Sequence, residues 1–293
     1  MTESLSTTPQ PAATSVFAWL GQAMRNNITT SLSVGVFAAL VAMALLAPWL
    51  AGDPNLLTAG TRLRAPDAFF WFGTDHLGRD IFDRAVYGAR VSLIVGVGCA
   101  TLAIALGLMV GMLCGFYRWI DAFVMRIMDG IMAIPSILLA IALTALMHPS
   151  VMTVLIAIVV PEIPRTARLV RSIVLTLREQ TFVQSAIVSG SSDARILLRH
   201  LLPNTVAPMI VQATYVCASA ILTEAGLSFL GAGVPPETVT WGNVIASGRS
   251  YFLIAPWIIF FPGVLLALTV LSINLLGDSL RDTLDPRLAR SLR

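Results

Sequence analysis

Lysine is absent from this chain of 293 residues, and all 19 of its basic residues are arginine. A P-loop ATPase needs the lysine of its phosphate-binding loop to reach the β- and γ-phosphates of the nucleotide. A Schiff base or an amine nucleophile needs the same side chain. The absence of lysine therefore excludes P-loop ATP hydrolysis and lysine-based covalent catalysis within this polypeptide.

Charge of either sign is also scarce. Charged residues make up 12% of the chain, whereas soluble proteins average about 25%. Hydrophobic residues account for 56%, the mean hydropathy is +0.81, and the formal net charge is a modest +3. This composition indicates a polytopic membrane protein, surrounded by membrane lipid rather than bound to nucleic acid.

Cysteine and histidine are few and scattered. The three cysteines are Cys99, Cys114 and Cys217. They lie inside apolar segments at spacings that match no zinc, haem or redox pattern, which favours burial as small hydrophobic side chains. The histidines His76, His148 and His200 are isolated along the sequence and offer no cluster of ligands. We therefore predict no disulfide framework, no metal site and no cofactor in this chain.

Long uncharged runs are what the sequence has instead. Runs of about the 20 residues needed to cross a bilayer cover residues 31–50, 91–115, 130–147 and 251–276. A fifth run follows Pro203 and reaches Thr223. The last run comes fourth in chain order and begins at Val151. It reaches a spanning length only if the helix continues through Pro161 and Pro164; the alternative is an interfacial helix. We count six spans, because the chain enters and leaves this region on opposite sides.

These runs predict an all-α membrane protein built from consecutive regions. Residues 1–30 form a cytoplasmic tail, disordered because its start is rich in Ser, Thr, Pro, Ala and Gln. Residues 31–90 hold an uncleaved first anchor and a periplasmic loop. Residues 91–278 form a core with five further spans, and residues 279–293 form a second cytoplasmic tail.

Arginine placement predicts the orientation, because loops retained in the cytoplasm carry the excess of positive charge. With the N-terminus inside, 13 arginines fall on the cytoplasmic side and 6 on the outer side. Both termini are therefore expected in the cytoplasm, and so is the loop over residues 180–204.

This loop is a polar interruption in an otherwise apolar chain. Phe182, Val183, Ala186 and Ile187 form an apolar stripe at helical spacing, and Gly190 follows Ala186 by four residues. The small residues leave one face thin enough for another protein to approach. A second helical stretch, from Asp193 to Leu202, begins with an acid that the helix dipole favours. The loop is interpreted either as a docking site for a soluble partner or as an ordinary connection.

The spacing within this loop resembles the EAA loop of the membrane subunits of bacterial ABC importers. Gly190 and the pair Leu202-Pro203 lie at the separation typical of that loop. The glutamate of the motif is Gln184 here and its first alanine is Ser185, so any ion pair made by that glutamate is in doubt. The resemblance implies a loop that couples to an ATPase, with the following candidate residues: Val183, Gln184, Ser185, Ala186, Gly190, Asp193, Leu202 and Pro203.

Other stretches resemble the C-type permease subunit of dipeptide, oligopeptide and nickel importers, of the binding-protein-dependent transport family. They are residues 72–80 with Arg84 and 87–93, then 224–231, 241–243, and 277–282 with 284–287, in the expected order. The resemblance implies a type I importer permease fold with six transmembrane helices in the cell inner membrane. It also implies a second homologous permease subunit, two ATP-binding subunits that bind the ATP, and a periplasmic substrate-binding protein.

Several charged residues invite a functional or a structural interpretation. In the outer loop, Asp75, Arg79, Asp80, Asp83 and Arg84 are spaced for a ladder of exposed ion pairs on a helix, either as a structural clamp or as a surface for a receptor.

Three further charged residues lie in or near predicted spans. Glu162 and Arg165 are three residues apart and are expected to pair, either facing a cavity or near the cytoplasmic headgroups. Glu224 is expected to have a structural or gating role rather than to contact substrate. We treat these three as candidate pathway or gate residues. Gly107, Gly111 and Gly115 predict close packing of the second span against another helix.

The sequence therefore predicts a non-enzymatic permease subunit that forms half of an ATP-driven import pathway for di- or oligopeptides. Nickel and glutathione are alternative substrates. A secondary transporter driven by an ion gradient is a rival from another class, but ionisable groups occur in one span and no internal repeat is visible. A structural subunit of a membrane enzyme is a third possibility, and it predicts no ATPase partner.

Overall fold

The computed structural model describes residues 28–284, which are helical apart from turns, loops and one isolated β-bridge between Thr74 and Asp80. The α-helices are α2 (Ile28–Leu45), α3 (Ala47–Leu50), α4 (Ile81–Phe116), α5 (Arg118–Met132), α6 (Ser136–Leu146), α7 (Val151–Arg178), α8 (Thr181–Val188), α9 (Asp193–Arg195), α10 (Leu202–Phe229), α11 (Trp241–Gly248) and α12 (Trp257–Leu284). Short 3₁₀ turns cover Ala59–Thr61 and Arg249–Tyr251, and a π-helical turn covers Ile196–Leu201.

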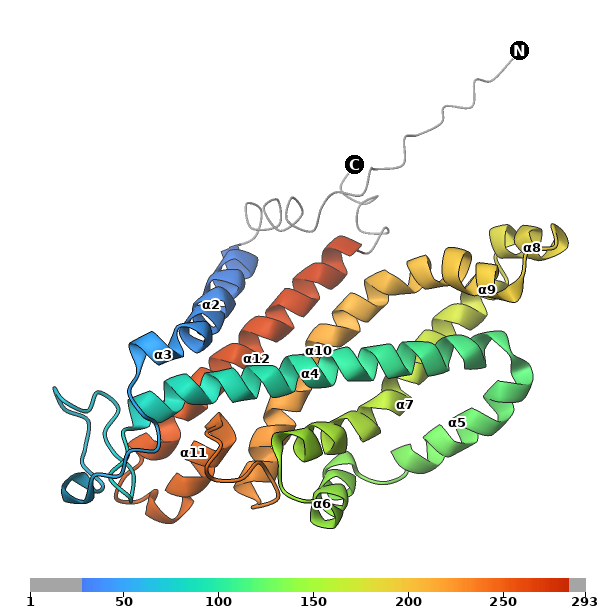
Figure 1. Cartoon of the computed structure of the whole chain (residues 1–293). Coiled ribbons are helices and arrows are strands. Elements are labelled where there is room, and N and C mark those ends of the chain that lie inside the picture. The colour runs from blue at the N-terminus through green and yellow to red at the C-terminus, as the bar shows by residue number, and fades with distance from the viewer. Residues whose placement is uncertain (1–27, 285–293) are drawn as a thin grey trace.

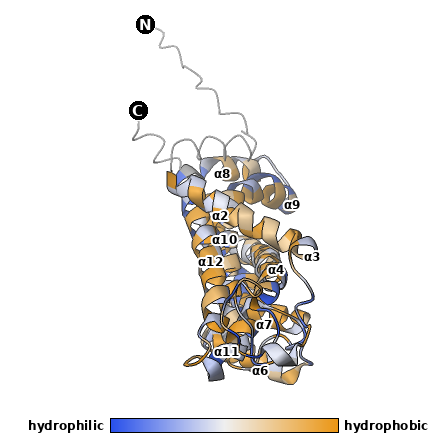
Figure 2. Ribbon diagram, turned by 90° about the vertical axis from the view of Figure 1, so that its left-hand side faces the viewer, coloured by the Kyte–Doolittle hydropathy of each residue, from blue (hydrophilic) through white to orange (hydrophobic). Residues whose placement is uncertain are grey.

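The long helices form a bundle around α4. Helix α4 packs along α7 and α10, and α12 lies between α10 and α2 (Figure 1). The short helices α8 and α9 lie at one end of the bundle, and α6 and α11 lie toward the opposite end (Figure 2). The described residues therefore form an all-α bundle with two distinct ends.

Four described helical segments are long and apolar enough to cross a membrane: Ile28–Leu45, Ile81–Phe116, Asp193–Phe229 and Trp257–Asp282. The predicted third span, residues 130–147, is not one straight helix. Helices α5 and α6 meet there at an angle of 89° and make at most one broken span. Pro135 at the N-cap of α6 explains the break, since the residue before a proline avoids the helical conformation.

Helix α7 is the predicted fourth span. It runs unbroken for 28 residues through Pro161 and Pro164, a length of about 42 Å. Its acidic and basic side chains set it apart from the apolar spans. Six spans therefore remains a prediction, which depends on α7 and on α5 and α6 together forming one broken span. At the C-terminal end, α12 continues to Leu284, beyond the start of the predicted tail at residue 279. The rest of both predicted tails, residues 1–27 and 285–293, lies outside the described residues.

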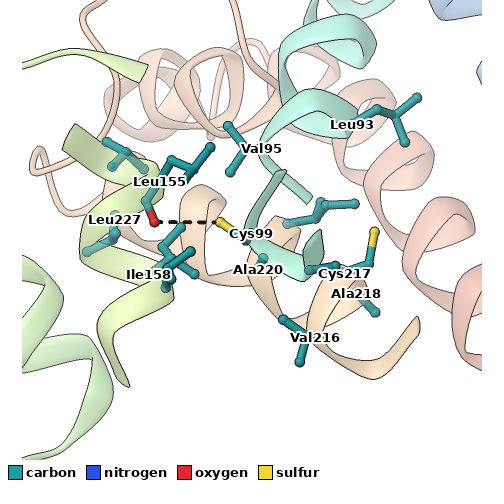
Figure 3. Packing of buried hydrophobic residues seen from close by; sticks show 14 of the residues in the cluster. Leu93, Val95, Cys99, Leu155, Ile158, Val216, Cys217, Ala218, Ala220 and Leu227 are labelled. Atoms are coloured by element: carbon teal, nitrogen blue, oxygen red, sulfur yellow. Dashed lines mark hydrogen bonds between the residues drawn. The ribbon is translucent and has the colours of Figure 1, made fainter. Parts of the chain in front are cut away.

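The main apolar core lies where α4, α7 and α10 meet. Val95 and Cys99 of α4, Ile158 of α7 and Ile221 of α10 are almost completely buried there. The Cys99 thiol lies 3.8 Å from the Leu155 carbonyl oxygen, and Cys217 belongs to the same cluster (Figure 3). Cys99, Cys114 and Cys217 are free and buried, as the sequence predicted.

Three glycines bring α4 and α7 into close contact. A Cβ atom at Gly107 would lie 2.5 Å from the Thr166 Cβ, and one at Gly111 would lie 2.5 Å from the Ala167 carbonyl oxygen. A Cβ atom at Gly115 would lie 2.6 Å from the Val174 Cβ. Real Cβ atoms do not come this close, so α7 lies on α4 at a separation that only glycine permits. This confirms the predicted close packing and identifies α7 as the partner helix.

Candidate functional site

The loop between α7 and α10 folds as a helical hairpin whose turn depends on Gly190. Gly190 adopts a φ of +75° immediately after α8. The Ser191 N–H donates to the Ala186 carbonyl and the Gly190 N–H to the Ile187 carbonyl, each at 3.0 Å. These two bonds form a Schellman motif, which strongly favours glycine at the left-handed position. Gly190 thus ends α8 and sets the direction in which the chain continues.

The hairpin is anchored through a small apolar cluster. Val183 of α8 is fully buried, and so are Ile196 and Leu201 of the following turn. They pack with Val170 and Val174 of α7, and Ala186, Leu197 and Leu202 lie at the edge of the same cluster. The predicted apolar stripe is therefore split: Val183 points inward, whereas Phe182 and Ile187 are each 43% exposed.

The outer face of the hairpin is free within the chain. Gln184, Ser185, Gly190 and Pro203 are exposed, and Val188 is 87% exposed. A Cβ atom built on Gly190 meets no atom within 4 Å. This face combines small and apolar side chains at one end of the bundle, so it is open to a partner.

Hydrogen bonds fasten the hairpin to the ends of α4 and α7. The Gln184 Nε2 donates to the Arg178 carbonyl at 2.9 Å, and the Arg178 Nη1 donates to the Phe116 carbonyl at 3.0 Å. The Tyr117 hydroxyl donates to the Asp193 carboxylate at 3.0 Å, which raises the pKa of that hydroxyl. A displacement of the hairpin is therefore transmitted to α4 as well as to the two helices that it joins.

Replacing Gln184 with glutamate should weaken this attachment. A glutamate carboxylate has no N–H, so it cannot donate to the Arg178 carbonyl and brings a negative charge toward it. We expect a loss of about 1 kcal/mol in the docking of α8, seen as faster backbone amide exchange in α8. Gln184→Met is the matched control: it also lacks the donor but adds no charge. Unchanged exchange in both variants would contradict the role of this bond.

Asp193 and Pro203 lie in an arrangement that differs from the predicted one. Asp193 starts a helix of three residues, but a π-helical turn joins it to α10. The helix therefore runs from Asp193 to Phe229, and Pro203 does not restart it. Pro203 lies in the first turn of α10, directly after the π-helical turn. In a regular α-helix the proline ring would clash with the carbonyl four residues earlier, which belongs to Arg199. Here Arg199 lies in the wider π turn, which gives the ring more room.

Glu162 and Arg165 form the expected pair. The Arg165 Nη1 donates to the Glu162 Oε1 at 2.6 Å, near the middle of α7. Glu162 is 5% exposed, whereas the Arg165 side chain is 41% exposed. The Glu162 Oε2 has no hydrogen-bond partner among the described residues. The pair thus lies midway along a helix that crosses the bundle, with one carboxylate oxygen unsatisfied.

Glu224 joins three helices at the end of the bundle opposite α8. Its Oε1 accepts hydrogen bonds from the Ser228 and Thr240 hydroxyls, each at 2.8 Å. Thr240 also caps α11 by accepting from the Asn243 N–H. The next residue, Trp241, is fully buried and donates from its Nε1 to the Ala85 carbonyl of α4 at 2.8 Å. Glu224 is completely buried, and its Oε2 has no hydrogen-bond partner among the described residues.

The predicted ion-pair ladder in the outer loop is wrong except at its first step. Arg79 pairs with Asp75 at 2.6 Å, but Asp75 is fully buried rather than exposed. Asp80 instead caps α4 by accepting from the Phe82 N–H, and burial raises the pKa of the Asp80 carboxyl to about 6.

Asp83 and Arg84, the remaining two members of that ladder, do not form its ion pairs either. Asp83 accepts from the Gly52 N–H, and Arg84 is 1% exposed. The helix was predicted from charge spacing alone. Gly73 and Gly78, with φ of +74° and +79°, make residues 73–80 a turn.

Sequence reasoning also missed Tyr117 and Arg178. Their partners, Asp193 and Phe116, lie 76 and 62 residues away, so no local pattern reveals them. No group of three or more His, Cys, Asp or Glu side chains placed to bind a metal ion occurs within residues 28–284.

Comparison with known proteins agrees with this architecture. Residues 103–290 match the family described as the binding-protein-dependent transport system inner membrane component. The chain belongs to this family. It is thus a component of a transport system and a multi-pass protein of the inner membrane, with the apolar helices that such a component needs.

Three relatives cover most of the chain. A protein of Sinorhizobium fredii named a probable peptide ABC transporter permease is 51% identical over 87% of this chain and 88% of its own length. A dipeptide transport system permease of Alkalihalophilus pseudofirmus is 42% identical over 98% and 95%. A glutathione transport system permease of Escherichia coli is 43% identical over 85% and 83%.

Proposed function

We propose that this permease forms half of the translocation pathway of an ATP-driven importer for di- or oligopeptides. The observation that carries the proposal is the hairpin around Gly190: it is exposed at one end of the bundle yet anchored to α4, α7 and α10. Such an element can receive a push from a soluble partner and pass it to the membrane helices. The names of the relatives, which specify peptides, dipeptides and glutathione, support the substrate class.

The rest of the assembly follows from the same proposal. A second homologous permease subunit completes the pathway. Two ATP-binding subunits, one of which docks on this hairpin, bind and hydrolyse the ATP, since this chain has no lysine for a P-loop. A periplasmic binding protein delivers substrate to the end that carries α6 and α11. Both termini and the hairpin then lie in the cytoplasm, as the arginine excess predicts. Glu162, Arg165 and Glu224 remain candidate gate residues.

The mechanism involves no covalent chemistry in this subunit. Closure of the two ATP-binding subunits moves α8, and the tightly packed pair of α4 and α7 moves with it because glycine contacts hold the two helices together. The bundle then exchanges an inward-open state for an outward-open one, and the ligand that favours each state sets its population.

Purification of the assembled complex tests this proposal. We expect two ATP-binding subunits and a second permease subunit to co-purify with this chain. Proteoliposomes that hold the complex should import radiolabelled peptide only when ATP and the binding protein are both supplied. Uptake driven by an ion gradient without ATP would contradict the proposal. A binding protein that takes only a metal chelate would contradict the peptide assignment, and one selective for glutathione would narrow it.

A further inference from the structure

A cavity of about 720 Å³ lies among the first turn of α4, the end of α6, the start of α7 and the segment between α10 and α11. Its walls are mostly apolar, with Ile141, Val154, Val234 and Pro235 among them. Polar groups reach it from Thr144, Thr153, Ser228, Asn243 and Ser247. The size and the mixture of many apolar with few polar groups are those of a site for a small organic molecule.

Arg84 brings to this cavity a guanidinium that forms no ion pair within residues 28–284. The Arg84 side chain lines the cavity although the residue is 1% exposed. Its Nη1 makes long hydrogen bonds to the Pro54 carbonyl, at 3.3 Å, and to the Asn55 Oδ1, at 3.4 Å. Its Nε has no partner among the described residues. Both bonded partners are neutral, so neither compensates the charge.

The aspartates between residues 75 and 83 have other hydrogen-bond or ion-pair partners. Asp75 pairs with Arg79, the other arginine that lines the cavity. Asp80 caps α4 through the Phe82 N–H, and Asp83 accepts from the Gly52 N–H. Within residues 28–284, no ion pair includes Arg84. A buried charge without a counter-ion is strongly unfavourable. An anion that enters the cavity would therefore supply the counter-ion that Arg84 lacks.

We propose that this cavity binds the carboxylate end of the transported peptide, with Arg84 as its counter-ion and the apolar walls around its side chains. The proposal rests on the function proposed above and specifies a site within it. A peptide carboxylate suits a guanidinium through paired hydrogen bonds, and the Arg84 Nε has no partner among the described residues. Arg84 thereby discriminates a free carboxyl terminus from an amidated one.

Thiol labelling in the assembled complex tests the charge of the cavity without ATP or uptake. Ser247→Cys places a thiol on the wall, and the native cysteines are buried. In nanodiscs of neutral lipid, we expect an anionic methanethiosulfonate to react faster than a cationic one. After normalisation to free thiol, the preference should be at least about fivefold. Arg84→Gln should abolish it, whereas Arg90→Gln, on the exposed side of α4, should leave it unchanged.

Peptide protection in the same Ser247→Cys complex tests the ligand, and it needs no change at Arg84. Trialanine should slow the labelling, and trialanine amide should slow it much less. Equal labelling by both reagents, no protection by trialanine, or no labelling at all would overturn the proposal, the last because a partner subunit then fills the cavity. Protection by anionic lipid but not by peptide would also overturn it. Failure of ATP-driven uptake would instead contradict the proposed function.

Discussion

Replacing Gly111 with leucine is expected to separate α7 from α4 and to leave little correctly folded chain in the membrane. Even the Cβ atom of an alanine would lie 2.5 Å from the Ala167 carbonyl oxygen and 2.6 Å from the Val170 Cβ. These atoms belong to the backbone and to a buried β-branched side chain, so neither can turn aside. Overpacking of a core typically costs about 1–3 kcal/mol and occasionally more, and a leucine adds three further carbon atoms to this contact. The yield and the thermal midpoint of the detergent-solubilised protein should both fall sharply.

Gly35→Leu provides the matched control for this experiment. Gly35 lies inside another apolar helix, α2, but a Cβ atom there meets nothing within 4 Å. The two variants therefore share the loss of a helical glycine and the gain of a large side chain, and differ in the space available. If Gly111→Leu were as stable as Gly35→Leu, the close contact between α4 and α7 would not hold the bundle together.

Replacing Gly190 with valine is expected to uncouple transport while the chain still inserts into the membrane. The φ of +75° disfavours any side chain, and a β-branched one most of all. The cost of about 1–3 kcal/mol can be avoided by unwinding the end of α8, far from the core of the bundle. We expect ATP-driven uptake to fall by more than tenfold, with the amount of inserted protein unchanged.

Gly190→Asn separates two explanations of that loss. Asparagine tolerates the left-handed conformation far better than valine does, yet it adds a side chain to the exposed face. If the turn matters, the asparagine variant retains most of its uptake. If a thin docking face matters, both variants lose uptake and neither retains the ATP-binding subunits on purification. Normal uptake and normal co-purification of Gly190→Val would remove Gly190 from the coupling mechanism.

The sequence was most informative where a side-chain pattern has one physical cause. Glycines at intervals of four on α4 predicted a close helix contact, and the contact is present because no other residue leaves enough room. Glu162 and Arg165 were expected to pair from their spacing of three, and they do. The Glu162–Arg165 pair lies within one helix, so no distant segment had to be known. For the glycines of α4, only the identity of the partner helix could not be predicted.

Elsewhere, tertiary context decided the outcome. The apolar run over residues 130–147 contains a bend of 89°. Hydropathy measures how apolar a segment is and does not reveal a change of helix direction, so Pro135 was the feature of the sequence that indicated the bend. The charges after Asp75 have helical spacing, but two glycines with positive φ turn the chain there. Tyr117 contacts Asp193, which lies far along the chain, and Arg84 lines a cavity formed by several distant segments. No local pattern contains that information.

The continuous helix from Asp193 to Phe229 has a consequence for the energy supply of the cell. Its 37 residues follow about 55 Å of helix axis, so one continuous helix links the hairpin around Gly190 with the buried Glu224. If a state open at both ends existed, protons would leak through it and discharge the membrane potential. Because the helix is continuous, a movement of one end is passed on to the other. We therefore expect that import through this subunit leaves the proton gradient intact.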